Sequence, residues 1–156
     1  MIEMNKKGVL ELVWWITTVV IVLLVLLPVI KFVGSKYPFY TPNIFFITLF
    51  ITFTRYIFLL KHTFLANQKM LKLILVFLPI PLFFYSIDAL FNFQDFMDKG
   101  DHIAMLSHMD PDPAINLSKY IKYQYVFLGT GSIFVLFLFP IRMIISIWRG
   151  INKGTV

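Results

Sequence analysis

Four long apolar stretches divide this chain, and they constrain its fold more than any other feature. The first, residues 12–30, contains 19 residues without a charge. The others are 43–60, 73–93 and 123–141, in which the only charges are Arg55 and Asp88. About 20 apolar residues cross the hydrocarbon of a bilayer as a helix, at ~1.5 Å each. Because 156 residues are too few to bury four such stretches in a soluble core, we expect an all-α integral membrane protein with four transmembrane helices.

Composition and charge agree with this class and exclude several others. Hydrophobic residues make up 59% of the chain and charged residues 14%, against about 45–50% and about 25% in soluble domains. Without cysteine, the chain has no disulfides, thiolate metal sites or cysteine nucleophiles. The net charge of +6 gathers at the ends of apolar stretches, as is typical of membrane-flanking Lys and Arg. We therefore expect a lipid bilayer as partner, and neither nucleic acid nor a cofactor.

The pattern predicts a single membrane domain over 1–156, an up-down bundle with helices near 10–33, 43–62, 72–93 and 121–148. Pro79 and Pro81 predict that the third helix is kinked or locally opened, because proline lacks the backbone donor that a helix needs. The polar stretch 94–120 is predicted to be an outer loop.

The distribution of Lys and Arg predicts the orientation of these helices. One side would carry eight basic residues: Lys6, Lys7, Lys61, Lys69, Lys72, Arg142, Arg149 and Lys153. The other side would carry five: Lys31, Lys36, Lys99, Lys119 and Lys122. The positive-inside rule then places both termini in the cytoplasm. Together with the Lys, Ile, Phe and Asn bias, this favours a bacterial cytoplasmic membrane.

Ionisable groups within the apolar stretches are the first candidates for function, because charges at membrane depth are costly. By helical rise, Arg55 lies roughly 10 Å from the cytoplasmic side and Asp88 roughly 24 Å from it. This difference in depth argues against a direct pair between them. Glu11 can instead meet Arg55 or Arg142, and Asp88 can meet a lysine of the outer side. The alternative is that Arg55 extends to the inner headgroups and Asp88 is hydrated.

The outer loop contains an apolar pattern and a group of possible metal ligands. Phe93, Phe96 and Met97 share a helical face, which predicts a short amphipathic helix on the membrane surface. Gly100 is expected to end it, Asp101 to cap a second short turn, and the Asp-Pro-Asp-Pro run at 110–113 to be extended or turning. Imidazole and carboxylate groups can hold a divalent cation, and the candidate ligands are His102, His108, Asp98 and Asp101. Their spacing matches no metal motif, which favours a solvated acidic loop.

Small residues in the fourth stretch predict close helix packing. Gly129, Gly131 and Ser132 lie in its outer half, where small side chains let helix backbones approach. The spacing is not GxxxG, so the patch indicates packing more than dimerisation. It can equally accommodate an aromatic side chain of the same bundle.

Three functions are compatible with these observations. The sequence has no catalytic constellation and no string of ionisable groups, which favours a non-catalytic accessory or structural subunit of a larger membrane complex. A small oligomeric transporter or channel, using Arg55 and Asp88, is the second hypothesis. The third is a membrane-embedded enzyme acting on lipid or quinone, although His62 is predicted to lie on the opposite side from His102 and His108.

Overall fold

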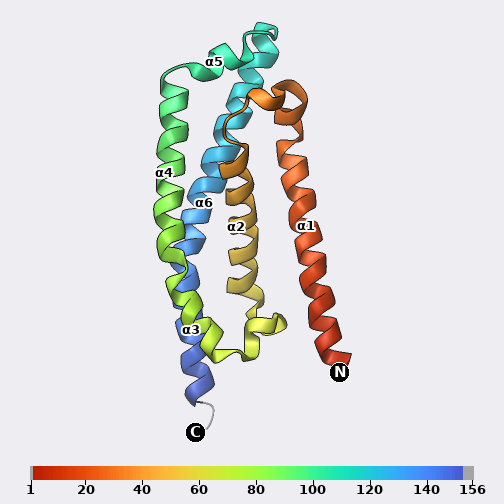
Figure 1. Ribbon diagram of the computed structural model, residues 1–156, viewed down its shortest axis with the longest axis vertical. Helices are drawn as coiled ribbons and strands as arrows, with labels where there is room; N and C mark the ends of the chain where they lie inside the picture. Colours follow the sequence, from red (N-terminus) through yellow and green to blue (C-terminus); the bar gives the residue numbers. More distant parts are fainter. Residues whose placement is uncertain (1, 153–156) are drawn as a thin grey trace.

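The computed structural model describes residues 2–152, with side chains for 8–63, 65–66 and 68–152. Lys153 and the side chains of Lys6 and Lys7 lie outside this description. The described residues are almost entirely helical and contain no strand. Figure 1 shows both chain termini at one end of the elongated molecule, which we name the terminal end, and α5 at the other, which we name the loop end.

Four helical segments are long and apolar enough to cross a membrane, as the sequence predicted. They are built from α1 (Ile2–Phe32), α2 (Tyr40–Leu59), α3 with α4 (Lys69–Phe77 and Pro79–Asp98) and α6 (Pro111–Ile151). Helix α5 (Asp101–Leu106) lies between α4 and α6, and the 3₁₀ turns η1 (Gly34–Lys36), η2 (Leu60–His62) and η3 (Phe64–Asn67) complete the connections. The long helices lie side by side along the long axis (Figure 1).

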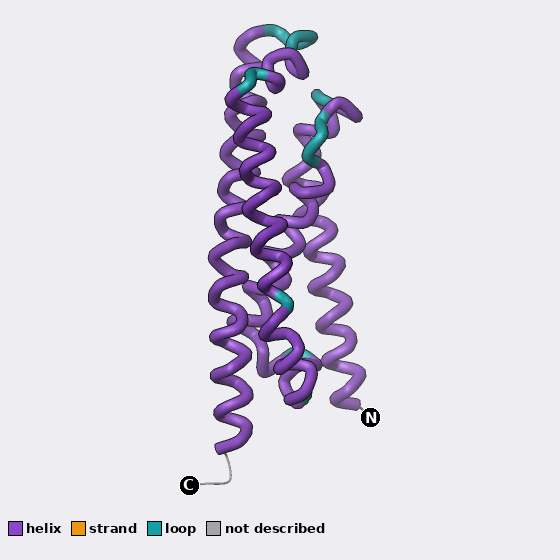
Figure 2. The backbone as a smooth tube through the Cα atoms, turned by 60° about the vertical axis from the view of Figure 1, so that its left-hand side comes forward, coloured by secondary structure: helices purple, strands orange, loops and turns teal. Residues whose placement is uncertain are grey.

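The breaks between helices follow from glycine and proline. Gly34 and Gly100 adopt φ values of +61° and +79°, which side chains other than glycine rarely accept, and they end α1 and α4 with sharp turns. The third stretch is interrupted at Leu78, directly before Pro79. Figure 2 shows this interruption as a short loop inside an otherwise helical segment. The expected local opening of this helix is therefore confirmed.

The connection at the loop end is shorter than the predicted loop 94–120. Helix α4 continues to Asp98 and α6 already begins at Pro111. The apolar face of Phe93, Phe96 and Met97 is real, but it packs on the core of the bundle instead of forming a separate surface helix.

The Asp-Pro-Asp-Pro run also differs from expectation. Asp110 is extended, as the residue before a proline should be, but Pro111, Asp112 and Pro113 form the first turn of α6. Proline is tolerated there because the first backbone N–H groups of a helix have no partner within the helix. Similarly, Gly100 occupies the capping position of α5, and Asp101 is its first helical residue.

Helix α6 is the centre of the bundle, since it packs against α1, α2, α3, α4 and α5. Buried apolar side chains form two clusters along it. The cluster at the loop end includes Phe93 stacked on Tyr125, with ring centroids 3.9 Å apart. The cluster at the terminal end includes Phe53 against Phe139 at 4.4 Å. Close packing of this kind holds membrane helices together, because lipid supplies little hydrophobic driving force between them.

Candidate functional site

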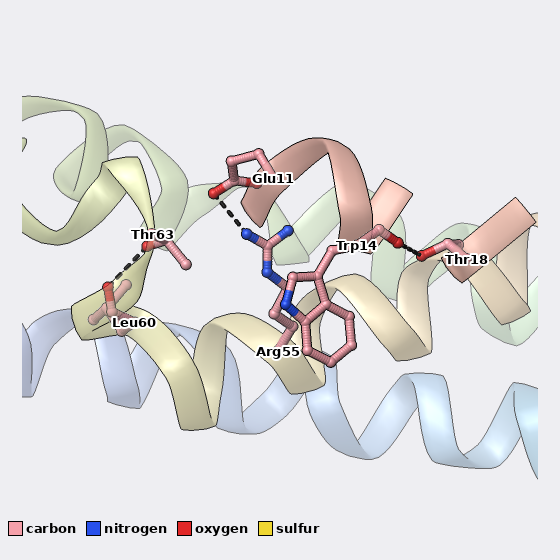
Figure 3. A network of polar contacts seen from close by, with 6 residues as sticks. All are labelled: Glu11, Trp14, Thr18, Arg55, Leu60 and Thr63. Atoms are coloured by element: carbon pink, nitrogen blue, oxygen red, sulfur yellow. Dashed lines mark hydrogen bonds and ion pairs between the residues drawn. The ribbon is translucent and has the colours of Figure 1, made fainter. Parts of the chain in front are cut away.

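A deeply buried cation, Arg55, is part of an ion pair between the first two membrane helices. Arg55 on α2 places Nη2 2.7 Å from Oε1 of Glu11 on α1. The side chains are only 5% and 17% exposed. Figure 3 shows the guanidinium pointing from α2 toward α1, where the carboxylate meets it. The sequence left Arg55 and Arg142 as possible partners of Glu11, and the structure shows that the partner is Arg55.

Two aromatic rings complete the surroundings of Arg55. Its guanidinium carbon lies 5.6 Å from the ring centre of Trp14 and 5.5 Å from that of Tyr56. Aromatic faces attract cations, and this attraction grows when water is excluded. Trp14 comes from the same helix as Glu11 (Figure 3), so α1 supplies both the anion and one ring.

The hydrogen-bonding capacity of Arg55 is not used up by these contacts. Nε and Nη2 are buried, and neither has an acceptor in hydrogen-bond geometry within the described residues. Nη2 is close enough to Glu11 for an ion pair, but the contact is not aligned for a hydrogen bond. A guanidinium has five N–H donors, and leaving them unpaired in a low-dielectric environment is costly. Within the described residues, Nε is therefore a buried donor that no side chain satisfies.

The other charged candidates lie elsewhere. Arg142 donates Nε–H to the carbonyl of Ile57 at 2.8 Å, which links α6 to α2. Asp88 is exposed on α4 and accepts a hydrogen bond from Asn92, 3.0 Å away on the next turn. The described residues show no ion pair between Asp88 and a lysine. Arg55 and Asp88 are not brought together.

The small residues of α6 contact the other helices of the same bundle. A Cβ added to Gly129 would lie 2.6 Å from Leu90 and 3.2 Å from Phe46. One added to Gly131 would lie 2.9 Å from Phe50. Ser132 donates its hydroxyl to the carbonyl of Phe46 at 2.9 Å. These contacts place α2 and α4 directly against the backbone of α6.

The residues considered as metal ligands do not assemble. No group of three or more His, Asp or Glu side chains gathers within the described residues. His108 instead places Nε2 3.0 Å from the carbonyl oxygen of Phe32, a hydrogen bond that it donates when Nε2 carries the proton. His62 in η2 and His102 in α5 lie at opposite ends of the molecule (Figure 1).

Two polar features were not singled out by the sequence. Lys72 was assigned to the basic flank of the third helix, but it is only 4% exposed and bonds the carbonyl of Ala66 and the hydroxyl of Ser146. Tyr37 and Asn43 are buried together near the loop end. Burial raises the pKa of the Tyr37 hydroxyl above its ordinary value, although the adjacent Asn43 opposes this. Both burials depend on residues distant in the sequence, which a single pattern does not reveal.

Comparisons of the chain with protein-family models, with curated proteins and with solved structures find no match.

Proposed function

We propose that this chain is a non-catalytic accessory or structural subunit of a larger complex in the bacterial cytoplasmic membrane. In this proposal the helices form an up-down bundle with both termini in the cytoplasm, and α5 lies at the outer surface. The partner is another membrane protein, which contributes a transmembrane helix.

The observation that carries this proposal is an apolar hollow at mid-bundle. It measures about 290 Å³ and lies where α4 begins after the break at Leu78, beside the proline within α6. Its lining is entirely apolar: Pro79, Ile80, Phe83, Phe84, Leu136, Phe137 and Pro140. Pro79, at the start of α4, and Pro140, within α6, both line the hollow.

A recess of this kind suits a protein partner. Membrane helices associate by fitting side chains of one helix between those of another. Phe84 and Phe137, at the rim, are 66% and 67% exposed, so they offer large apolar surfaces to such a helix. A bulky apolar side chain of a partner helix would fill the hollow and gain dispersion contacts that disordered lipid chains make less well.

Site-specific photocrosslinking in intact membranes tests this proposal. A photoreactive phenylalanine analogue replaces Phe84 or Phe137, and Phe127 is the matched control, because it is also on α6 and 66% exposed. We expect one discrete protein adduct from the two rim positions, and only lipid adducts from the control. Lipid adducts at all three positions, with a monomeric chain after mild detergent extraction, would contradict the proposal.

A second candidate function is anion transport by an oligomer. The observation in its favour is the buried guanidinium of Arg55, which retains unpaired donors. Anion flux into liposomes containing only the purified chain tests it, with Arg55→Leu as the inactive variant. Absence of flux for the wild-type chain would remove this candidate and leave the subunit proposal untouched.

A further inference from the structure

A second hollow, at the terminal end, concentrates basic side chains. It measures about 570 Å³ and lies between η2, α3 and the end of α6. Five of its nine lining residues are cations: Lys61, Lys69, Lys72, Arg142 and Arg149. None of the nine is acidic. We name this region the basic cleft.

Helical spacing explains why the cations converge. Lys69 and Lys72 are three residues apart on α3, and Arg142, Ser146 and Arg149 follow at intervals of four and three on α6. Residues three or four apart share a helix face. Since α3 packs against α6, the two basic faces meet across the cleft, and Lys61 in η2 adds a third side.

The basic cleft contains polar groups that are already held in place. Lys72 is 4% exposed, and its ammonium donates to the carbonyl of Ala66 at 2.6 Å and to the hydroxyl of Ser146 at 3.0 Å. An ammonium has three N–H donors, so one remains. Arg142 is fixed by its bond to Ile57, which uses only Nε–H. Cations positioned in advance by internal bonds lose little further freedom when a ligand binds.

The positive charge of the cleft is not compensated within the described chain. Both ion pairs of the described residues lie elsewhere, at Glu11–Arg55 and at Asp95–Lys99. Arg142, Lys69 and Lys72 line the same cleft, so their positive charges repel one another. Like charges at such distances destabilise one another until an anion enters between them.

The geometry points to the basic cleft as a binding site for an anionic phosphate group. Arg and Lys side chains from separate elements surround phosphate oxygens well, Arg as a fork of donors and Lys as a point charge. Trp148, 62% exposed beside Arg149, is a residue type that collects where lipid meets water. Basic pockets between membrane helices at this level bind phospholipid headgroups. A soluble phosphate compound shares the same chemistry.

The test compares lipid and phosphate binding by the full chain purified in a non-ionic detergent. Native mass spectrometry measures retention of phosphatidylglycerol against phosphatidylcholine, and calorimetry measures binding of inorganic phosphate. The test variant is Lys69→Gln with Arg149→Gln, because both side chains are exposed and make no internal hydrogen bond that the structure describes. The control is Lys119→Gln with Lys122→Gln, two exposed lysines of α6 near the loop end, which lowers the net charge equally.

We expect the wild-type chain to retain one phosphatidylglycerol in preference to phosphatidylcholine. The test variant should bind it about 30-fold more weakly, the combined effect of two cations at a membrane surface, and the control variant should bind it like the wild type. Calorimetric binding of inorganic phosphate that the test variant weakens would support the site with a soluble ligand. Failure of both probes to bind, or equal losses in test and control variants, would overturn the proposal. Neither result depends on the apolar hollow that carries the subunit proposal.

Discussion

The two ends of the bundle use charge in different ways. At the loop end, the exposed residues Asp95, Lys99 and Asp88 interact with residues four positions away in the sequence. At the terminal end, Arg55 pairs with Glu11 across two helices, and the cations of the basic cleft converge from three elements. The loop end has local, hydrated interactions, whereas the terminal end has long-range ones that are partly withdrawn from water.

This difference indicates where charge determines structure. Pairs within one helical turn form wherever the helix forms, and solvent screens them, so they contribute little. A buried pair between two helices requires those helices to be correctly packed, and it penalises arrangements that separate the charges. We therefore expect substitutions at the terminal end to change stability, and equivalent substitutions at the loop end to leave it almost unchanged.

The largest expected effect is the loss of one partner of the buried ion pair. Glu11→Gln leaves the Arg55 charge buried without an anion, and should lower the free energy of unfolding by about 3 kcal/mol. The double variant Glu11→Gln/Arg55→Met removes the uncompensated charge and should recover most of this loss. Circular dichroism during titration of mixed micelles with dodecyl sulfate measures both.

The matched control for this pair is Asp88→Asn at the loop end. It replaces an exposed carboxylate with a side chain of similar shape, so the free energy of unfolding should change by less than about 0.5 kcal/mol. Equal losses for Glu11→Gln and Asp88→Asn would show that the two ends do not differ in the proposed way.

A smaller effect is expected where α6 meets α2 and α4. Gly129→Ala places a methyl group 2.6 Å from Leu90 and 3.2 Å from Phe46, so these side chains must move. We expect a loss of about 1–2 kcal/mol in the same unfolding measurement.

Gly150 provides the control on the same helix. A Cβ there has only an ordinary contact, 3.7 Å from Lys69. Because alanine is the better helix former, Gly150→Ala should be neutral or stabilise the chain by up to about 1 kcal/mol. If Gly129→Ala is equally neutral, the close approach of α2 and α4 to α6 is wrong.

The smallest effect is expected at the exposed pair Asp95–Lys99. The hydrogen bond that Lys99 donates to Asp95, followed by the charge of that carboxylate, raises the pKa of the ammonium above its ordinary 10.5. A raised pKa in the folded state means that the pair stabilises the chain below pH 10.5 and loses this contribution as the pH rises further.

The NMR titration of the Lys99 side chain checks this prediction. Asp95→Asn should lower the pKa of Lys99 toward 10.5 without a measurable change of unfolding at neutral pH. A clear loss of stability in this variant would contradict the expectation that charges at the loop end contribute little to stability.

The sequence predicts the membrane class, the four spans and the helix break, because each depends on local composition. Apolar length identifies a span, and the break at Leu78 coincides with two closely spaced prolines, Pro79 and Pro81. The same reasoning did not predict how far the flanking helices extend into residues 94–120, where α4 continues to Asp98 and α6 begins at Pro111. The periodicity of Phe93, Phe96 and Met97 shows that one face is apolar, but it does not show whether lipid or protein covers that face.

The candidate sites were less accessible from the sequence, because they depend on packing between distant segments. Depth limited the partners of Glu11 to Arg55 and Arg142, and only the arrangement of the helices selects Arg55. Lys72 resembles an ordinary flanking lysine, since its burial depends on Ser146, 74 positions away. The cations of the basic cleft come together because α3 packs against α6. No local sequence pattern predicts that contact.

The central position of α6 has a consequence for biosynthesis. The helix that packs against every other one is the last of the four spans to be synthesised. When the first three spans enter the membrane, α6, the helix that contacts all of them, has not yet been synthesised. We therefore expect the first three spans to insert before the bundle is fully packed, as in the two-stage view of membrane proteins. During that interval we expect Leu90, Phe46 and Phe50, which pack against Gly129 and Gly131 in the folded chain, to be open to lipid, chaperones or a partner subunit.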